Sequence, residues 1–118
     1  MCGRYTIIAK AEDLKTRYKI LDAGAFENRY NAAPTQLLPV ITNREPENFT
    51  YFHWGIISNM AKNKSISTKL INTTAETLEE KASFKAALKF RRCIVPADGY
   101  YEWKTLGKKT KVPYRISL

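Results

Sequence analysis

The chain has 118 residues, of which 44% are hydrophobic and 26% are charged, a composition typical of a globular protein that excludes a wholly disordered or collagen-like chain. The length suits one hydrophobic core, so a single domain over residues 1–118 is predicted. Twenty Lys and Arg residues against eleven Asp and Glu residues give a net charge of +9, which favours a polyanionic partner such as nucleic acid.

The compartment can be addressed from the apolar runs and the cysteines. No stretch approaches the length that spans a bilayer, and the start lacks the charged and apolar regions of a secretory signal. We therefore expect a cytoplasmic protein with no membrane partner, associated with the nucleoid if it binds DNA. Cys2 and Cys93 show neither metal-ligand spacing nor a disulfide pattern, so both are expected to be thiols.

The first half of the chain predicts one helix and two strands. A helix over 10–21 is indicated by apolar residues at three- and four-residue intervals, namely Ala11, Leu14, Tyr18 and Leu21. Residues 27–36 are expected to form an irregular connection. β-Branched residues over 37–42 predict a short strand, in which Pro39 suggests a sheet edge. Aromatic residues over 49–57 predict a strand that is covered on both faces or lines a groove.

The next part predicts a loop, a strand and a capped helix. The loop is expected over 58–65 and the strand over 66–72. Thr73 and Glu76 have the spacing of a capping box, which would begin a helix over 75–90. Its buried side would contain Leu78, Ala82 and Leu88.

The last part predicts strands joined by turns. Residues 91–103 are typical of a strand, a turn at Asp98-Gly99 and a second strand, on which Tyr100 and Glu102 share one face. After a polar connection, residues 112–118 alternate as another strand that ends on apolar residues.

Five segments, in order along nearly the whole chain, resemble the SOS response-associated peptidase (SRAP) family of abasic-site processing proteins. They are "MCGRY", "NRYNAAPTQLLPV", "HWGII", "INTTAET" and "RRCIVPADGYYEW", of which the first and last are the most specific. The resemblance implies an α+β fold with a mixed, largely antiparallel, barrel-like sheet and two or more flanking helices. It also implies a basic groove for single-stranded DNA that contains abasic sites, and no metal or organic cofactor.

The cysteine at position two has two interpretations. Taken alone, a cysteine near a terminus is most often a small hydrophobic residue. The resemblance implies instead that Met1 is removed, so that Cys2 carries both a free α-amine and a thiol. An amine attacks the aldehyde of a ring-opened abasic sugar, and a thiol two carbons away can close a thiazolidine ring, giving a stable DNA–protein cross-link.

The resemblance also assigns helpers to Cys2. Asn72 matches the family's active-site asparagine, whose amide can bond the cysteine terminus or the sugar; alternatively, it is a residue that precedes a helix cap. Glu102 matches the catalytic glutamate, which can move protons between the amine, the carbinolamine and departing water. A paired structural carboxylate on a strand is the alternative for Glu102.

Contacts with DNA are expected from Arg4 and Trp54, although core packing is an equal alternative for Trp54. Where the family usually has a proline and a second tryptophan, this chain has Ser58 and Met60. Thr74 replaces an arginine of the family's motif, so a phosphate contact is expected to be missing there. Nearby lysines can compensate, namely Lys62, Lys64 and Lys69, with Lys69 as our DNA-binding candidate.

Three other residues are expected to be structural. Cys93 lies in a strand pattern, Glu76 is a cap, and His53 is a packed, hydrogen-bonded side chain. SRAP domains continue past residue 118 and carry there a histidine thought to assist ring opening. We therefore expect the chain to be a fragment, a split protein or a truncated relative, with a missing C-terminal complement or self-association.

The sequence leaves two other functions open. One is a thiol peptidase that uses Cys2 as an N-terminal nucleophile, and the other is a DNA-binding remnant without chemistry.

Overall fold

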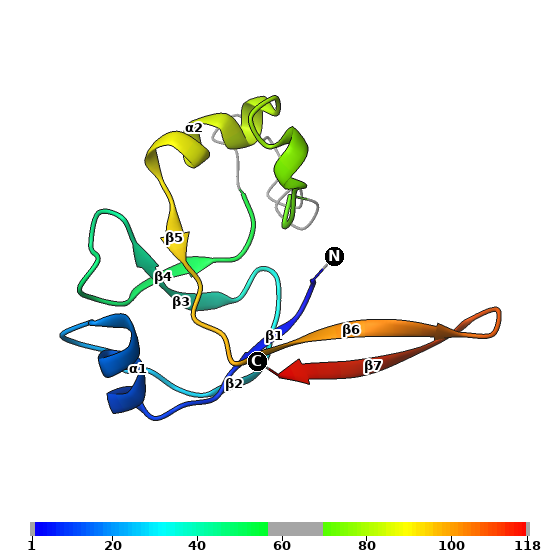
Figure 1. Cartoon of the computed structure of the whole chain (residues 1–118), viewed down its shortest axis with the longest axis horizontal. Coiled ribbons are helices and arrows are strands. Elements are labelled where there is room, and N and C mark those ends of the chain that lie inside the picture. The colour runs from blue at the N-terminus through cyan, green and yellow to red at the C-terminus, as the bar shows by residue number, and fades with distance from the viewer. Residues whose placement is uncertain (1, 57–69, 118) are drawn as a thin grey trace.

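The computed structural model describes residues 2–56 and 70–117, and these are arranged as two antiparallel sheets and two α-helices (Figure 1). The α+β class and the antiparallel character are therefore confirmed. The expected loop over 58–65, most of the expected strand over 66–72 and the candidate Lys69 lie outside the described residues.

The larger sheet has the strand order β2-β1-β6-β7, with all neighbours antiparallel. Its strands are β1 (Tyr5–Ile7), β2 (Arg29–Ala32), β6 (Gly99–Leu106) and β7 (Thr110–Ser117). Strands β6 and β7 form a long hairpin that projects away from the rest of the molecule (Figure 1). The expected irregular connection over 27–36 was wrong for β2, because Tyr5 and Ile7 of β1 supply it with a pairing edge.

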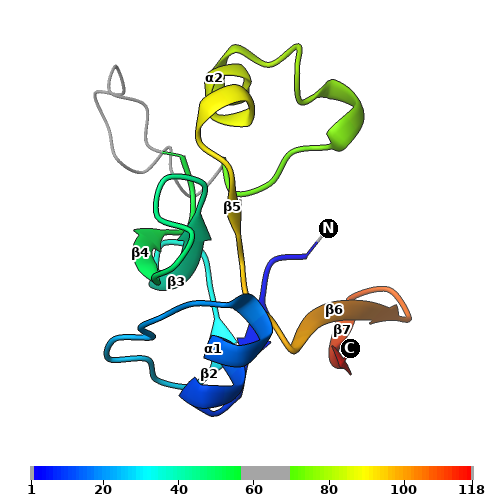
Figure 2. The same ribbon diagram turned by 60° about the vertical axis from the view of Figure 1, so that its left-hand side comes forward.

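The smaller sheet has the order β4-β3-β5 and is separate from the first, so the fold is not closed into the expected barrel. Its strands are β3 (Leu37–Thr42), β4 (Thr50–His53) and β5 (Cys93–Ile94). Strand β3 is central, so the edge position suggested by Pro39 was wrong. Leu38 and Val40 are buried, as expected for a central strand. Figure 2 shows β5 leading from α2 toward the larger sheet.

The strand pair expected over 91–103 is split between the two sheets. β5 pairs with β3, whereas β6 pairs with β1 and β7. Asp98 does not make a hairpin turn: its carboxylate accepts a hydrogen bond from the Ile8 amide and forms an ion pair with Arg115. Residues 95–98 therefore connect the two sheets, and Pro96 within this segment is fully buried.

Helix α1 (Ala11–Tyr18) is shorter than the expected helix over 10–21. It ends because Lys19 adopts a left-handed conformation, with φ of 56°, and donates its amide to the Lys15 carbonyl. The turn redirects the chain, so Leu21 is 70% exposed and Ile20 takes a buried place in the core instead.

The helix expected over 75–90 is broken into a 3₁₀ turn, η2 (Ala75–Thr77), and α2 (Ala82–Phe90). The capping box was wrong, because Thr74 is the N-cap of η2 and makes no capping bond with its side chain. The carboxylates of Glu76, Glu79 and Glu80 would repel one another at helical spacing. The expected buried side was also wrong, because η2 and α2 contain no buried residue and Leu78 and Leu88 are only half-buried.

The core joins β1, α1 and β3. One cluster contains Tyr5, Ile7, Leu14, Ala32 and Leu38, and a second contains Ile20, Ala23 and Ile41. Gly99 holds the larger sheet close, because a Cβ atom there would lie 2.9 Å from the Ile116 carbonyl oxygen and 3.1 Å from the Thr6 hydroxyl. Strand β6 therefore packs closely against both of its neighbours, β1 and β7, at Gly99.

Candidate functional site

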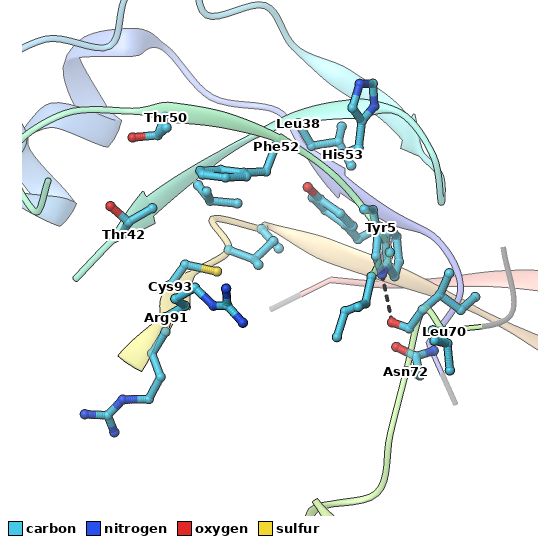
Figure 3. Close-up of a pocket in the computed structure, with 18 of the residues that line it drawn as sticks. Tyr5, Leu38, Thr42, Thr50, Phe52, His53, Leu70, Asn72, Arg91 and Cys93 are labelled. Carbon is cyan, nitrogen blue, oxygen red and sulfur yellow. Dashed lines mark hydrogen bonds between the residues drawn. The ribbon is translucent and has the colours of Figure 1, made fainter. Parts of the chain in front are cut away.

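A cavity of about 1020 Å³ lies between the two sheets, and we call it the inter-sheet cavity. Its walls come from β1, β3, β4 and β5, from residues 70–72 and from the start of β6, and apolar side chains predominate. Figure 3 shows Cys93 and Arg91 on one side of it, with Leu70 and Asn72 at the opposite side. Its lining includes Cys2, Tyr5, Phe52, Trp54, Asn72, Cys93, Val95 and Tyr100.

Cys2 lines this cavity and is half-buried. Its thiol donates a hydrogen bond of 3.2 Å to the Arg4 carbonyl, which also accepts the Tyr101 amide at 2.9 Å. The side-chain amide of Asn72 donates to the Cys2 carbonyl at 2.6 Å. Cys2 is thus bonded directly by Arg4 and Asn72. Strand β6 fixes it indirectly, because Tyr101 bonds the same Arg4 carbonyl.

Asn72 owes its position to Trp54. The indole Nε1 of Trp54 donates to the carbonyl of Ile71, the preceding residue, at 3.0 Å. The Trp54 ring itself packs against the buried Tyr5 ring, with centroids 5.6 Å apart. Since Tyr5 lies three residues after Cys2, the two aromatic rings tie the asparagine and the cysteine to one rigid unit.

Glu102 lies on β6, next to the segment that carries Cys2. Tyr101 of β6 bonds the Arg4 carbonyl, so β6 runs alongside residues 4–7. Side chains alternate along a strand, so Glu102 projects from the same face as Tyr100, which lines the inter-sheet cavity. Glu102 is half-buried. Glu102 therefore shares a face of β6 with Tyr100, but its own side chain is not among those that line the cavity.

The DNA-binding candidates differ in their surroundings. The Arg4 guanidinium donates to Asn31 Oδ1 at 2.9 Å, which holds it against β2. Trp54 is half-buried and packs against Tyr5, as expected from the alternative of core packing. It also lines the cavity.

The three residues expected to be structural fall in different places. Cys93 lies in β5 and lines the cavity, but it is exposed instead of packed in the core; its surroundings still raise the pKa of its thiol by withholding water. His53 is exposed, and its Nδ1 donates to the Thr35 carbonyl at 2.8 Å. Glu76 is exposed in η2 and makes no cap.

Sequence reasoning missed Arg44, Arg91 and Arg92, which line the cavity beside β5. They are brought together because the Asn43 amide bonds the Arg92 carbonyl at 3.1 Å. The arginine doublet at the start of the last family segment was the signal that could have revealed them. Also missed was the phenol of Tyr5, which is buried and has no hydrogen-bond partner among residues 2–56 and 70–117; burial raises its pKa to about 12.

Over residues 2–56 and 70–117, no three His, Cys, Asp or Glu side chains are grouped so that they could hold a metal ion. Within the same part of the chain, no helix has the length and apolar character needed to cross a membrane.

Two antiparallel sheets, with an asparagine that bonds a near-terminal cysteine at the cavity between them, are the features by which the class of this protein is recognised. The chain belongs to the SOS response associated peptidase (SRAP) family, whose model matches residues 1–118. This confirms the resemblance seen in the five sequence segments.

Among individual proteins, the chain is similar to the abasic site processing protein YoqW of Bacillus subtilis, with 43% identity over 100% of this chain and 54% of the relative. It is also similar to the abasic site processing protein HMCES of Rattus norvegicus, with 36% identity over 74% of this chain and 29% of the relative. A crystal structure of a Bacteroides thetaiotaomicron protein superposes with a TM-score of 0.80 and 28% identity, over 98% of this chain and 54% of that one. The chain thus spans about half the length of YoqW and of the Bacteroides protein, and its match covers 29% of HMCES.

Proposed function

We propose that the chain takes part in abasic-site processing, by forming a covalent cross-link between Cys2 and an abasic site in single-stranded DNA. The observation that carries this proposal is the 2.6 Å hydrogen bond from Asn72 to the Cys2 carbonyl, at the wall of an open cavity. Family membership supports it, because relatives that match the whole chain are named abasic site processing proteins.

The proposed chemistry starts after hydrolytic removal of Met1, which frees the α-amine of Cys2. The amine nitrogen attacks the aldehyde carbon of the ring-opened sugar and forms a carbinolamine, which loses one water to give an imine. The thiol sulfur then bonds to the same carbon, and the thiol proton passes to the nitrogen. The products are a thiazolidine and one water, with no oxidant or reductant needed.

Glu102 and Asn72 have distinct proposed roles. Glu102 takes a proton from the attacking amine and returns it to the departing water, as a general acid–base requires. Its place on β6, the strand that runs beside the segment following Cys2, and on the same face as Tyr100 supports this role. Asn72 is a positioning residue: it holds the Cys2 carbonyl, which leaves the amine and the thiol to react.

The DNA strand is proposed to approach over basic and aromatic side chains. Arg4 and Lys69 supply phosphate contacts, and Trp54, which lines the cavity, supplies a ring face on which a base beside the lesion stacks. The net charge of +9 supports a polyanionic partner. Cys2 must stay reduced to react, which fits the cytoplasmic setting expected from the sequence.

The test uses mature protein, checked by mass for the loss of Met1, and a single strand with one abasic site. We expect a heat-stable adduct whose mass equals protein plus strand minus one water. Cys2→Ala abolishes it, whereas Cys93→Ala retains it. Cys2→Ser keeps the amine but not the thiol, so its adduct survives only after borohydride reduction. An adduct that persists in Cys2→Ala and disappears in Cys93→Ala contradicts the proposal.

The same samples separate the two other functions. A thiol peptidase cleaves peptides without any aldehyde present, and that turnover is lost in Cys2→Ala. A DNA-binding remnant binds the strand with steep salt dependence but gives no covalent product.

A further inference from the structure

The connection between β2 and β3 is a tight turn that contains a strained residue. The Gln36 amide bonds the Ala33 carbonyl at 3.2 Å, which closes a four-residue turn. The second residue of this turn is Pro34, and the third is Thr35, which has a φ of 71°. Glycine or asparagine is preferred at such a third position, and a β-branched residue there is a rare outlier. Strain of this kind persists only where the surrounding structure holds it, and it is concentrated at functional sites.

Thr35 is held by two residues at the end of β4. The imidazole Nδ1 of His53 donates to the Thr35 carbonyl at 2.8 Å. Because a carbonyl oxygen only accepts, this imidazole nitrogen must carry a proton. On its other side, the Thr35 amide donates to the Trp54 carbonyl at 2.9 Å. Both backbone polar groups of the strained residue are therefore bonded, one of them by the side chain of the single histidine in the sequence.

The same turn fixes Trp54, and Trp54 leads to the candidate site. Besides accepting the amide just described, Trp54 donates its own amide to the Gln36 carbonyl at 3.1 Å. The indole then donates to the Ile71 carbonyl at 3.0 Å, and the Asn72 side chain donates to the Cys2 carbonyl at 2.6 Å. In Figure 3 the imidazole lies apart from Asn72, so any effect on the cysteine must pass through this series of contacts.

We infer that His53 is a positioning residue for the reaction of Cys2, an inference that rests on the proposed function. The imidazole keeps Thr35 in the left-handed region, the turn keeps Trp54 in place, and the indole holds the segment that carries Asn72. His53 does not touch the substrate in this scheme. The alternative is a purely local role, in which the imidazole stabilises an exposed turn and has no effect on distant residues.

Four variants separate these two roles. His53→Ala removes the donor from an exposed side chain, so the domain should still fold, which circular dichroism checks. His53→Asn is the conservative variant, because the asparagine amide nitrogen is as far along the side chain as Nδ1 and also donates. In Thr35→Gly/His53→Ala, glycine adopts a φ of 71° without strain, so the turn no longer needs the imidazole. Asp22→Ala is the matched control, since it removes another exposed bond from a side chain to a turn, at 2.8 Å to the Gly24 amide.

The first measurement needs no DNA. In NMR spectra of the mature protein, the indole N–H signal of Trp54 is distinguished from that of Trp103 by Trp103→Phe. We expect the Trp54 indole to exchange with deuterium roughly two- to tenfold faster in His53→Ala, the factor expected for one lost hydrogen bond, and the Asn72 side-chain amide signal to shift. His53→Asn and the double variant should restore both signals, and Asp22→Ala should leave both unchanged.

The second measurement is the single-turnover rate at which Cys2 forms its adduct with the abasic strand. We expect a similar loss of roughly two- to tenfold in His53→Ala, and recovery in His53→Asn and in the double variant. A purely local role would lower the Tm of His53→Ala and change neither the indole exchange nor the adduct rate.

Two results overturn the inference. One is unchanged indole exchange in His53→Ala, and the other is a normal adduct rate in a variant whose Trp54 indole exchanges faster. Absence of any adduct in the wild type contradicts the proposed function instead, and the exchange measurement still decides whether His53 positions Trp54 and Asn72.

Discussion

Replacing Gly99 with alanine tests the close packing that holds β1 between β2 and β6. The added Cβ would lie 2.9 Å from the backbone oxygen of Ile116, whereas ordinary contacts of this kind begin at 3.4 Å. Strand β7 must therefore move by about half an ångström, and overpacking of this kind costs about 1–3 kcal/mol. Alanine also restricts the unfolded chain, which offsets about 0.4–1 kcal/mol. A net loss of about 1–2 kcal/mol is expected, roughly 4 °C in Tm for each kcal/mol.

The matched control for this substitution is Gly3→Ala. Gly3 also lies in an extended segment near Cys2, but its added Cβ meets nothing within 4 Å. Urea unfolding, followed by tryptophan fluorescence and analysed at constant m, should place the midpoint of Gly99→Ala below that of the wild type and the midpoint of Gly3→Ala at or slightly above it. Equal midpoints for the two variants would show that β7 yields freely, and the argument from close packing would then be wrong.

Three further predictions concern Tyr5, Asn72 and Arg4. Burial raises the pKa of Tyr5 from 10.0 to about 12, so the stability from its neutral phenol is complete below pH 10 and is lost as the pH rises toward 12. Tyr5→Phe should flatten this loss in urea titrations between pH 9 and 11, where the exposed Tyr114→Phe should not. Asn72→Ala removes one hydrogen bond of about 0.5–1.5 kcal/mol, so the rate of Cys2 adduct formation should fall by roughly two- to twelvefold, and an unchanged single-turnover rate would refute its positioning role. Arg4→Ala should weaken binding to an undamaged single strand and reduce the slope of log Kd against log salt by about 0.7; an identical slope would exclude a phosphate contact.

The parts of the fold that followed from the sequence are those in which local pattern and tertiary contact agree. The strand expected over 37–42 is present as β3, as its β-branched residues predict, and the strand expected over 112–118 corresponds to β7, which the structure describes up to Ser117. Tyr100 and Glu102 both lie on β6, two residues apart, and so share one face. Local pattern failed where distant partners decide the conformation. β2 exists because β1 offers an edge, and β5 and β6 separate because each finds a different sheet.

The candidate site shows the same division. Cys2 and Asn72 could be brought together from the family's motifs, and their hydrogen bond is present in the structure. The route by which Trp54 positions Asn72, through the carbonyl of Ile71, could not be foreseen, because a bond to a backbone oxygen leaves no trace in residue types. The exposure of Cys93 was also missed, since an apolar neighbourhood in sequence does not show which surface remains uncovered.

In the proposed function, the β6–β7 hairpin would set the order of events on DNA. Its turn at Gly107 carries Lys108, Lys109 and Lys111 at the tip, and its eight residue pairs make the arm roughly 26 Å long at about 3.3 Å per residue. A nucleic-acid backbone that binds these ammonium groups would be held at the tip of the hairpin. The aldehyde would still have to reach Cys2, beyond the opposite end of the hairpin. Salt would then govern how often strands are caught, and the reactive terminus alone would govern how often a caught strand is retained.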